Sequence, residues 1–335
     1  MIEHCRQHPW LVALAVVSVF VAAACSSDVE SSPDRIRVVA TTTIWGDVVG
    51  QLVGDDADVE VLMPVGVDPH DFQASSRQIA AIQDADLIVA NGLGLEESLD
   101  DVLDNAAADG ANVLRLAPDL DPIEFGHHGG TPKPCHPGTP STGEHEETVP
   151  DDHDDHDHGS CDPHVWMDPL RVSAATGLIG QALEALDPTI DWRTRVDAYR
   201  AELDVVDAEM TRLLDVVATS DRILITTHDS LGYFGTRLGY RVVAVVIPGG
   251  STLGDPSAAT LAEIVDTMER TGVRTIFSET TVSDRLAQAV AAELGDDVDV
   301  VELWTGSLGG PGSGAEHVTD MLVADARLVA DALAR

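Results

Sequence analysis

Apolar and polar positions alternate with two different periods along most of the chain, which predicts strands separated by helices. Short apolar runs typical of buried strands lie at residues 36–41, 58–63, 86–92, 112–117, 222–228, 241–247, 274–279 and 299–303. Helical spacing predicts helices at 44–54, 75–85, 95–110, 231–239, 257–272 and 283–295, and from about Glu316 to the end. This alternation indicates an α/β fold with two Rossmann-like lobes, each with a mostly parallel sheet of four strands covered by helices.

Two long helical patterns, at 169–187 and 192–218, separate the two groups of strands, and Pro188 ends the first of them. We therefore expect an N-terminal lobe at 36–168, a linking helix at 169–188 and a C-terminal lobe at 189–335. Open α/β sheets bind ligands beyond the carboxyl ends of their strands. This layout predicts a ligand cleft between the lobes.

The periodic pattern is interrupted at 118–163, where Pro, Gly, His and acidic residues predominate, so we expect a loop or a disordered insertion. It contains seven histidines: His127, His128, His136, His145, His153, His156 and His158. Flexible His and Asp side chains can bind cations weakly and concentrate them near a cleft. We interpret the insertion as a low-affinity metal-gathering loop, with a merely solvated linker as the alternative.

The first 24 residues have the pattern of an export signal. The apolar run at 11–24 is too short to span a bilayer comfortably, and it ends in small residues before Cys25. This arrangement resembles a bacterial lipoprotein signal peptide, in which Cys25 becomes the lipid-modified first residue and 25–35 a tether. An ordinary secretory signal is the alternative, and both predict an exported chain.

Charge and cysteine usage narrow the classes of partner. With 58 acidic and 19 basic residues, the formal charge of −39 disfavours nucleic acid and favours cations. Cys135 and Cys161 flank the histidine-rich segment, and an exported location permits a disulfide between them. Two metal-binding thiolates are the alternative, although the chain has no CxxC motif.

Three histidines outside the insertion share one setting. His70 in "PVGVDPHDF", His164 in "CDPHVWMDP" and His228 in "ITTHDSLGYF" each lie at the end of a predicted element, facing the predicted cleft. Imidazole is a good ligand for Zn²⁺, so three of them from separate segments predict a zinc site. The alternative is that each is an ordinary polar loop residue.

Several motifs, in order from about residue 36 to the C-terminus, carry a family resemblance: "VVATTTIWGDVV", "MPVGVDPHDFQAS", "ADLIVANGLGLEE", "DPHVWMDP", "THDSLGYF", "VIPGGSTLGDPSAATLAEIV", "IFSET" and "ELWTGSLGGPGSG". The chain resembles the ZnuA-like, or TroA-like, solute-binding lipoproteins of bacterial zinc and manganese ABC importers. The resemblance implies two α/β lobes joined by one long backbone helix, with metal in the cleft between them. It also implies His70, His164 and His228 as ligands.

The resemblance bears on the choice of metal and on the fourth ligand. Manganese-binding members tend to have Glu at the third position, so His228 favours Zn²⁺ over Mn²⁺. Many members carry Asp where this chain has Gly306, in "WTGS". The fourth position is then expected to be water, a residue of the insertion, or Glu279. Glu279 matches a strand-end glutamate of the family that would instead orient a histidine.

The resemblance implies a protein that captures Zn²⁺ outside the cell and delivers it to an ABC permease and its ATPase subunit. We expect a monomer, lipid-anchored to the outer face of the cell membrane, that is not an enzyme and binds no nucleic acid. The alternatives are manganese or iron binding by the same architecture, a metal-dependent surface adhesin, and a zinc hydrolase. The hydrolase would use the open fourth position, but the chain lacks an HExxH motif.

Overall fold

The computed structural model describes residues 35–125, 133–136, 161–247, 252, 254, 256–295 and 297–334, which all belong to one compact unit, Arg35–Arg335. The first half contains β1 (Ile36–Ala40), α1 (Thr43–Val53), β2 (Ala57–Val61), α2 (Ser76–Asp84), β3 (Leu87–Ala90), η1 (Glu97–Leu99), α3 (Asp100–Ala108), β4 (Val113–Arg115) and η2 (Ala117–Asp119). The junction contains η3 (Val165–Met167), α4 (Pro169–Leu186), α5 (Trp192–Leu214) and η4 (Thr219–Asp221). The second half contains β5 (Ile223–His228), α6 (Gly232–Leu238), β6 (Arg241–Ile247), α7 (Ala258–Thr271), β7 (Thr275–Glu279), α8 (Arg285–Leu294), β8 (Asp299–Leu303) and α9 (Val318–Leu333).

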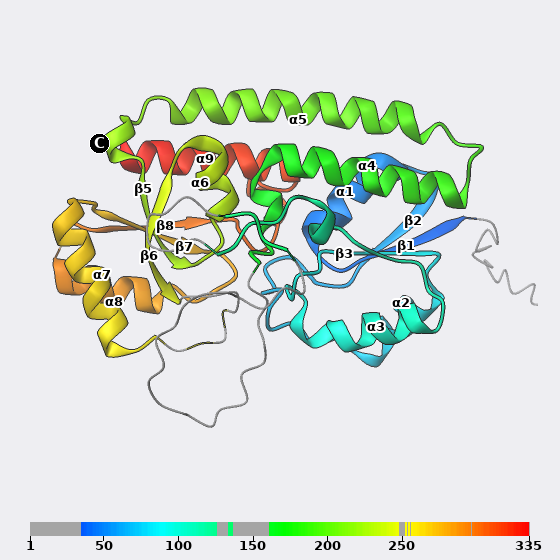
Figure 1. Cartoon of the computed structure of the whole chain (residues 1–335), viewed down its shortest axis with the longest axis horizontal. Helices are drawn as coiled ribbons and strands as arrows, with labels where there is room; N and C mark the ends of the chain where they lie inside the picture. The colour runs from blue at the N-terminus through cyan, green and yellow to red at the C-terminus, as the bar shows by residue number, and fades with distance from the viewer. Residues whose placement is uncertain are drawn as a thin grey trace, which may run out of the picture. The chain divides into compact units, whose positions relative to one another are not determined.

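The two halves repeat one sheet topology. The strand order is β2-β1-β3-β4 in the first sheet and β6-β5-β7-β8 in the second, and all neighbouring strands run parallel. Parallel neighbours need crossover connections, which the helices between the strands supply. The predicted α/β fold with two four-stranded sheets is confirmed (Figure 1).

One predicted helix begins later than its apolar spacing indicates. The pattern at 95–110 predicts a continuous helix, whereas the chain forms η1 and then α3 from Asp100. The buried carboxylate of Glu96 accepts hydrogen bonds from the backbone N–H groups of Asn91 and Gly92 and from the Thr41 hydroxyl. This contact fixes Glu96 at the end of β3 and delays the start of the helix.

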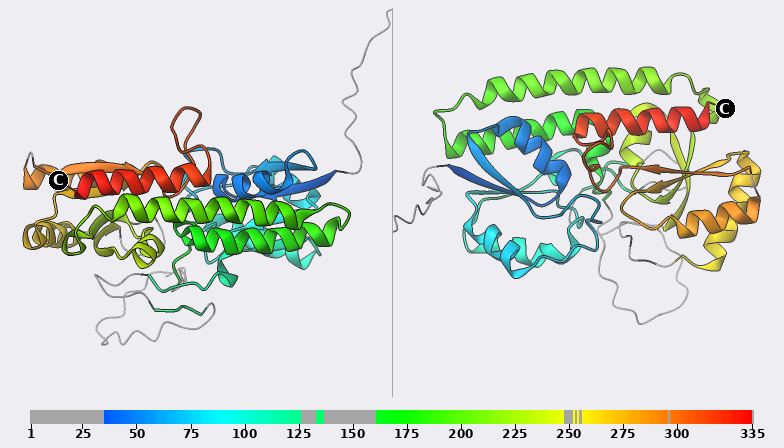
Figure 2. Two further views of the ribbon diagram at one scale, coloured as in Figure 1. Left: turned by 90° about the horizontal axis from the view of Figure 1, so that it is seen from above. Right: turned by 180° about the vertical axis from the view of Figure 1, so that it is seen from behind.

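Two long helices make the connection between the halves. α4 contacts α1 and β3, and α5 then packs against α4, α1 and α9; Figures 1 and 2 show α5 running alongside both α4 and α9. Close packing depends on small residues, because a Cβ at Gly180 would lie 2.4 Å from Val196 Cγ2. The helix predicted at 169–188 is α4, and the connection comprises α4 together with α5.

The largest apolar cluster extends from the first half through the linking helices to α9. Trp45 of α1 and Trp166 of η3 pack edge to face within it, with ring centroids 6.5 Å apart. Trp166 Nε1 donates to the carbonyl of Thr305, 2.8 Å away, and so joins η3 to the segment after β8. Among the described residues, no helix has both the length and the apolar character needed to cross a bilayer.

Candidate metal centre

The three predicted histidines come from three different kinds of local structure. His228 is the last residue of β5, one of the two central strands of its sheet. His70 lies in the loop after β2, where its backbone N–H donates to Asp68 Oδ1 over 3.0 Å. His164 precedes η3, and Asp168 and Pro169 then start α4, with the Asp168 carboxylate accepting from the Leu170 N–H.

The structure brings these three imidazoles together. Their candidate donor atoms all lie within 4.8 Å of one another, and His70 Nε2 is 3.4 Å from His164 Nε2. All three side chains are at most 2% exposed. Three buried imidazole nitrogens that converge on one point form a donor set suited to Zn²⁺ and other first-row transition metals.

Each imidazole has a carboxylate near its other nitrogen. His164 Nδ1 lies 2.8 Å from Asp162 Oδ1, His228 Nδ1 lies 3.3 Å from Glu279 Oε1, and His70 Nδ1 lies 3.8 Å from Glu97 Oε1. Metal-binding histidines usually donate their second ring N–H to such a group, which fixes the tautomer and the orientation of the ring. The arrangement leaves the three Nε2 atoms for a cation.

Burial and these carboxylates shift the charges of the site. Burial lowers the pKa of His164 well below its ordinary value, and His228 adds to this effect. Burial also acts to lower the pKa of His228, but the charge and hydrogen bond of Glu279, together with the charges of Asp229 and Asp68, outweigh it, and the pKa is raised. Burial raises the pKa of Asp162 to about 7, against the lowering effects of the His164 N–H and of nearby charges. Of these carboxylates, Glu279 therefore supplies the negative charge beside His228 that would help to balance the charge of a divalent cation.

Glu279 lies beside His228 rather than within the donor group. Its Oε1 accepts from the Ser230 hydroxyl and faces His228 Nδ1. Within the described residues, the candidate donor group consists of the three histidines, without a carboxylate. The position of Glu279 fits the orienting role that the sequence offered as the alternative to ligation.

Gly306 leaves little room for a fourth ligand from its own position. The residue is buried, and a Cβ added to it would lie 2.7 Å from Thr281 Oγ1 and 3.4 Å from Pro69 Cδ. A side chain there would require Thr281 to move. The packing around Gly306 is thus consistent with a site that takes its protein ligands from histidines.

The other predicted site residues that the structure describes are not members of the histidine cluster. Cys135 and Cys161 are joined in a disulfide, with their Cα atoms 5.5 Å apart, and His136 is exposed beside it. The remaining predicted site residues, Cys25 and the loop histidines His127, His128, His145, His153, His156 and His158, lie outside the described residues.

Three further residues of the site, Asp162, Glu97 and Asn91, were not predicted from the sequence. Asn91 follows β3, and its amide donates to the Pro163 carbonyl over 2.9 Å, beside His164. Asp162 had a detectable signal, because Asp-Pro-His occurs twice in the chain, each time before one of the clustered histidines. Glu97 had no such signal in the sequence. It approaches His70 only because the loops after β2 and β3 fold next to each other.

Comparison with known proteins places this geometry in context. Residues 38–332 match the model of a family described as the periplasmic component A of the zinc-uptake complex, ZnuA. The manganese-binding lipoprotein MntA of Halalkalibacterium halodurans is 24% identical over 312 residues, covering 92% of each chain. The iron-binding protein YfeA of Yersinia pestis is 26% identical over 291 residues, covering 86% of this chain and 83% of its own.

A solved structure has the same fold. The periplasmic zinc-binding protein TroA from Treponema pallidum superimposes with a TM-score of 0.72, at 24% sequence identity. The match covers 90% of this chain and all of that one. The names of these three relatives refer to three different metals, so the likeness identifies metal binding without identifying the ion.

Proposed function

Because the chain belongs to the family of periplasmic ZnuA components of zinc-uptake complexes, we propose that it captures Zn²⁺ outside the cytoplasm and delivers it to the permease of an ABC importer. The family is described as a component of a zinc-uptake complex and the relatives are named for the metals that they bind, so the chain is a metal-binding protein and not an enzyme. The zinc-hydrolase alternative is therefore dropped.

The convergence of three buried imidazoles is the observation that supports zinc. Zinc accepts a small set of nitrogen ligands, whereas manganese favours sites with carboxylate oxygens. Here the carboxylates of Asp162, Glu97 and Glu279 face the Nδ1 atoms instead. The relatives named for manganese and iron keep those two metals as the competing candidates.

The metal content of the purified protein tests this proposal. After exposure to equal zinc, manganese and iron(II), we expect about one zinc per chain by mass spectrometry of the metal. His228→Glu is the matched variant, since it places a carboxylate at the end of β5, and we expect it to retain relatively more manganese. Wild-type protein that binds manganese or iron in preference to zinc would overturn the assignment.

The insertion gives a second test of the same function. We infer that its histidines bind cations weakly and raise their concentration near the cleft. Replacing His127, His128, His136, His145, His153, His156 and His158 by Ser, which keeps the Cys135–Cys161 bond, should leave one tight zinc site and remove several weak ones in a calorimetric titration. Unchanged stoichiometry would refute the gathering role and leave the tight site unaffected.

The anchor and the partners complete the proposal. Lipidation of Cys25 would hold the protein, as a monomer, at the outer face of the membrane, next to a permease and its ATPase subunit. Deletion of the gene should prevent growth on chelated medium, with rescue by zinc alone. Normal growth of the deletion strain under these conditions would instead favour the adhesin alternative.

A further inference from the structure

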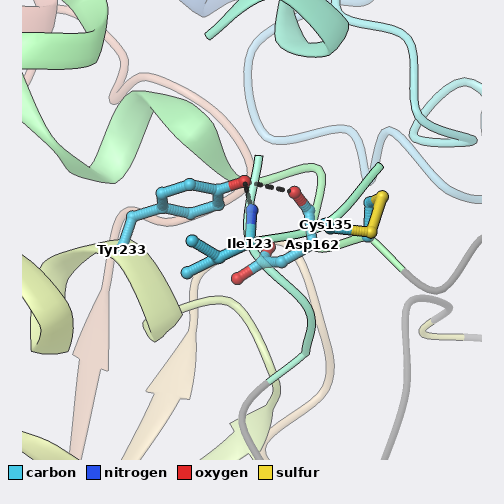
Figure 3. The surroundings of a disulfide bond; sticks show 5 residues. Ile123, Cys135, Asp162 and Tyr233 are labelled. Atoms are coloured by element: carbon cyan, nitrogen blue, oxygen red, sulfur yellow. Dashed lines mark hydrogen bonds between the residues drawn. A yellow bond between two sulfur atoms is a disulfide. The ribbon is translucent and has the colours of Figure 1, made fainter. Parts of the chain in front are cut away.

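A small hydrogen-bonded stem holds the chain just before His164. We use "disulfide stem" for residues 122–124, 133–135 and 161–162. The N–H of Cys135 donates to the Pro122 carbonyl, and the N–H of Asp162 donates to the Ile123 carbonyl, each over 2.8 Å. Glu124 pairs with Cys161, and the Cys135–Cys161 bond closes the stem (Figure 3).

Tyr233 reaches this stem from the other half of the molecule. It lies on α6, its side chain is fully buried, and its hydroxyl donates to the Asp162 carbonyl over 2.7 Å. The Tyr233 hydroxyl oxygen also accepts a hydrogen bond from the Ile123 N–H over 3.2 Å; Figure 3 shows both contacts. One phenol therefore holds both sides of the stem at the point where Asp162 begins the turn to His164.

The Asp162 side chain connects the stem to the imidazole of His164. Its Oδ1 accepts from the backbone N–H of His164 over 2.9 Å and lies 2.8 Å from His164 Nδ1. The carboxylate is fully buried, and a Cβ added to Gly232 would lie 2.5 Å from its Oδ2. The Asp162 carboxylate is thus packed closely against α6 and the stem.

We propose that Tyr233 and the Cys135–Cys161 disulfide are positioning groups for His164, which hold Asp162 where its carboxylate keeps the imidazole proton on Nδ1. Nε2 then remains the donor for the cation. This inference rests on the proposed zinc-binding function. It implies that zinc affinity depends on a disulfide and a phenol that are not themselves zinc ligands. Groups that orient a metal-binding histidine typically contribute about 10–100-fold to affinity.

Tyr233→Phe is the first test, because it removes only the hydroxyl. We expect zinc affinity, measured by competition with a chromophoric chelator, to fall about tenfold, the lower end of the range for such groups. Tyr240→Phe is the matched control, since it also removes a buried hydroxyl, one that donates to the Leu214 carbonyl over 3.0 Å. Its zinc affinity should equal that of the wild type.

Two further variants test the other parts of the arrangement. Cys135→Ser/Cys161→Ser should lower zinc affinity about as much as Tyr233→Phe. Gly232→Ala should also lower it, by pushing the Asp162 carboxylate. Gly50→Ala is its control, because a Cβ at that α1 position meets nothing within 4 Å. If the double cysteine variant does not fold, Tyr233→Phe and Gly232→Ala still decide the question.

A spectroscopic readout separates positioning from general loss of structure. In zinc-free protein, ¹⁵N chemical shifts should place the His164 proton on Nδ1 in the wild type and show a mixture of tautomers in Tyr233→Phe. Wild-type affinity and an unchanged tautomer in Tyr233→Phe and Gly232→Ala would overturn the inference. Failure of the wild type to bind zinc would refute the proposed function instead, and the tautomer would still test the positioning role.

Discussion

Two turns of the chain carry the same tripeptide, Asp-Pro-His, at residues 68–70 and 162–164. In both, the Asp Oδ1 accepts from the backbone N–H of the histidine two residues later, over 3.0 Å in the first and 2.9 Å in the second. Proline prevents the preceding residue from becoming helical, so the tripeptide sets the same local turn twice. Each turn delivers a histidine to the same cluster.

The two aspartates differ in their remaining contacts. The Asp162 carboxylate also faces Nδ1 of its own histidine, His164. Asp68 instead accepts from the Thr252 hydroxyl in the second half of the chain, and His70 faces Glu97. The Asp-Pro-His motif thus determines the turn. The tertiary contacts of each aspartate decide whether its carboxylate orients the imidazole, as in Asp162, or binds a residue of the other half, as in Asp68.

We expect the largest effect on zinc affinity from Asp162→Asn, and a much smaller one from Asp68→Asn. Asp162→Asn weakens the only acceptor that we assign to His164 Nδ1, so zinc affinity should fall about 10–100-fold. Asp68→Asn keeps an acceptor for the His70 N–H and should change affinity by no more than about fivefold. Chelator competition on both variants measures the difference. Equal losses would mean that the two turns are functionally equivalent.

Asp325, another buried aspartate, shows the effect of burial without a histidine partner. Asp325 Oδ1 accepts from the Trp304 N–H, and burial raises the pKa of Asp325 to about 7. The unfolded carboxyl ionises near its ordinary value of 3.8. The folded state therefore binds the proton more tightly, and stability is lost as the pH rises from about 4 to 7.

Asp325→Asn should remove this pH dependence. At pH 8 the variant should be more stable than the wild type by about 1–3 kcal/mol, and the advantage should disappear near pH 4. Thermal or denaturant unfolding of zinc-free protein at the two pH values measures it. Asp331→Asn, an exposed aspartate of the same helix, controls for the loss of one charge. A pH-independent difference would contradict the assignment.

The smallest effect concerns the contact that is peculiar to the first turn. Thr252→Ala removes the hydroxyl that donates to Asp68. We expect zinc release to become faster by at most about fivefold, since a hydrogen bond contributes about 1 kcal/mol net. The effect is small because the backbone N–H of His70 still donates to Asp68 in the variant. Stopped-flow release into excess chelator measures the rate, and Thr252→Ser should restore it. Slower release in Thr252→Ala would show that the contact opposes metal retention.

The apolar pattern predicted every strand and main helix to within a few residues, because central strands such as β3 and β5 are fully buried and the helices bury one face. It misplaced the start of α3, because Glu96 forms hydrogen bonds with the backbone after β3. The three histidines could be found as well, because His70 follows a predicted strand, His164 precedes a predicted helix and His228 ends a predicted strand. The partners of their Nδ1 atoms are separated from them by 2, 27 and 51 residues, and only the nearest could have been inferred.

The sequence by itself determined the two α/β halves, the Asp-Pro turns and the residues that could bind a metal, because these depend on periodicity and local backbone preferences. Only the tertiary structure decided that the imidazoles converge and that Glu279 faces His228. Only it places Tyr233 between the two sides of the disulfide stem. These features depend on how helices and strands from distant parts of the chain pack. A contact between groups about 70 residues apart, such as that of Tyr233 with Asp162, leaves no periodic trace in the sequence.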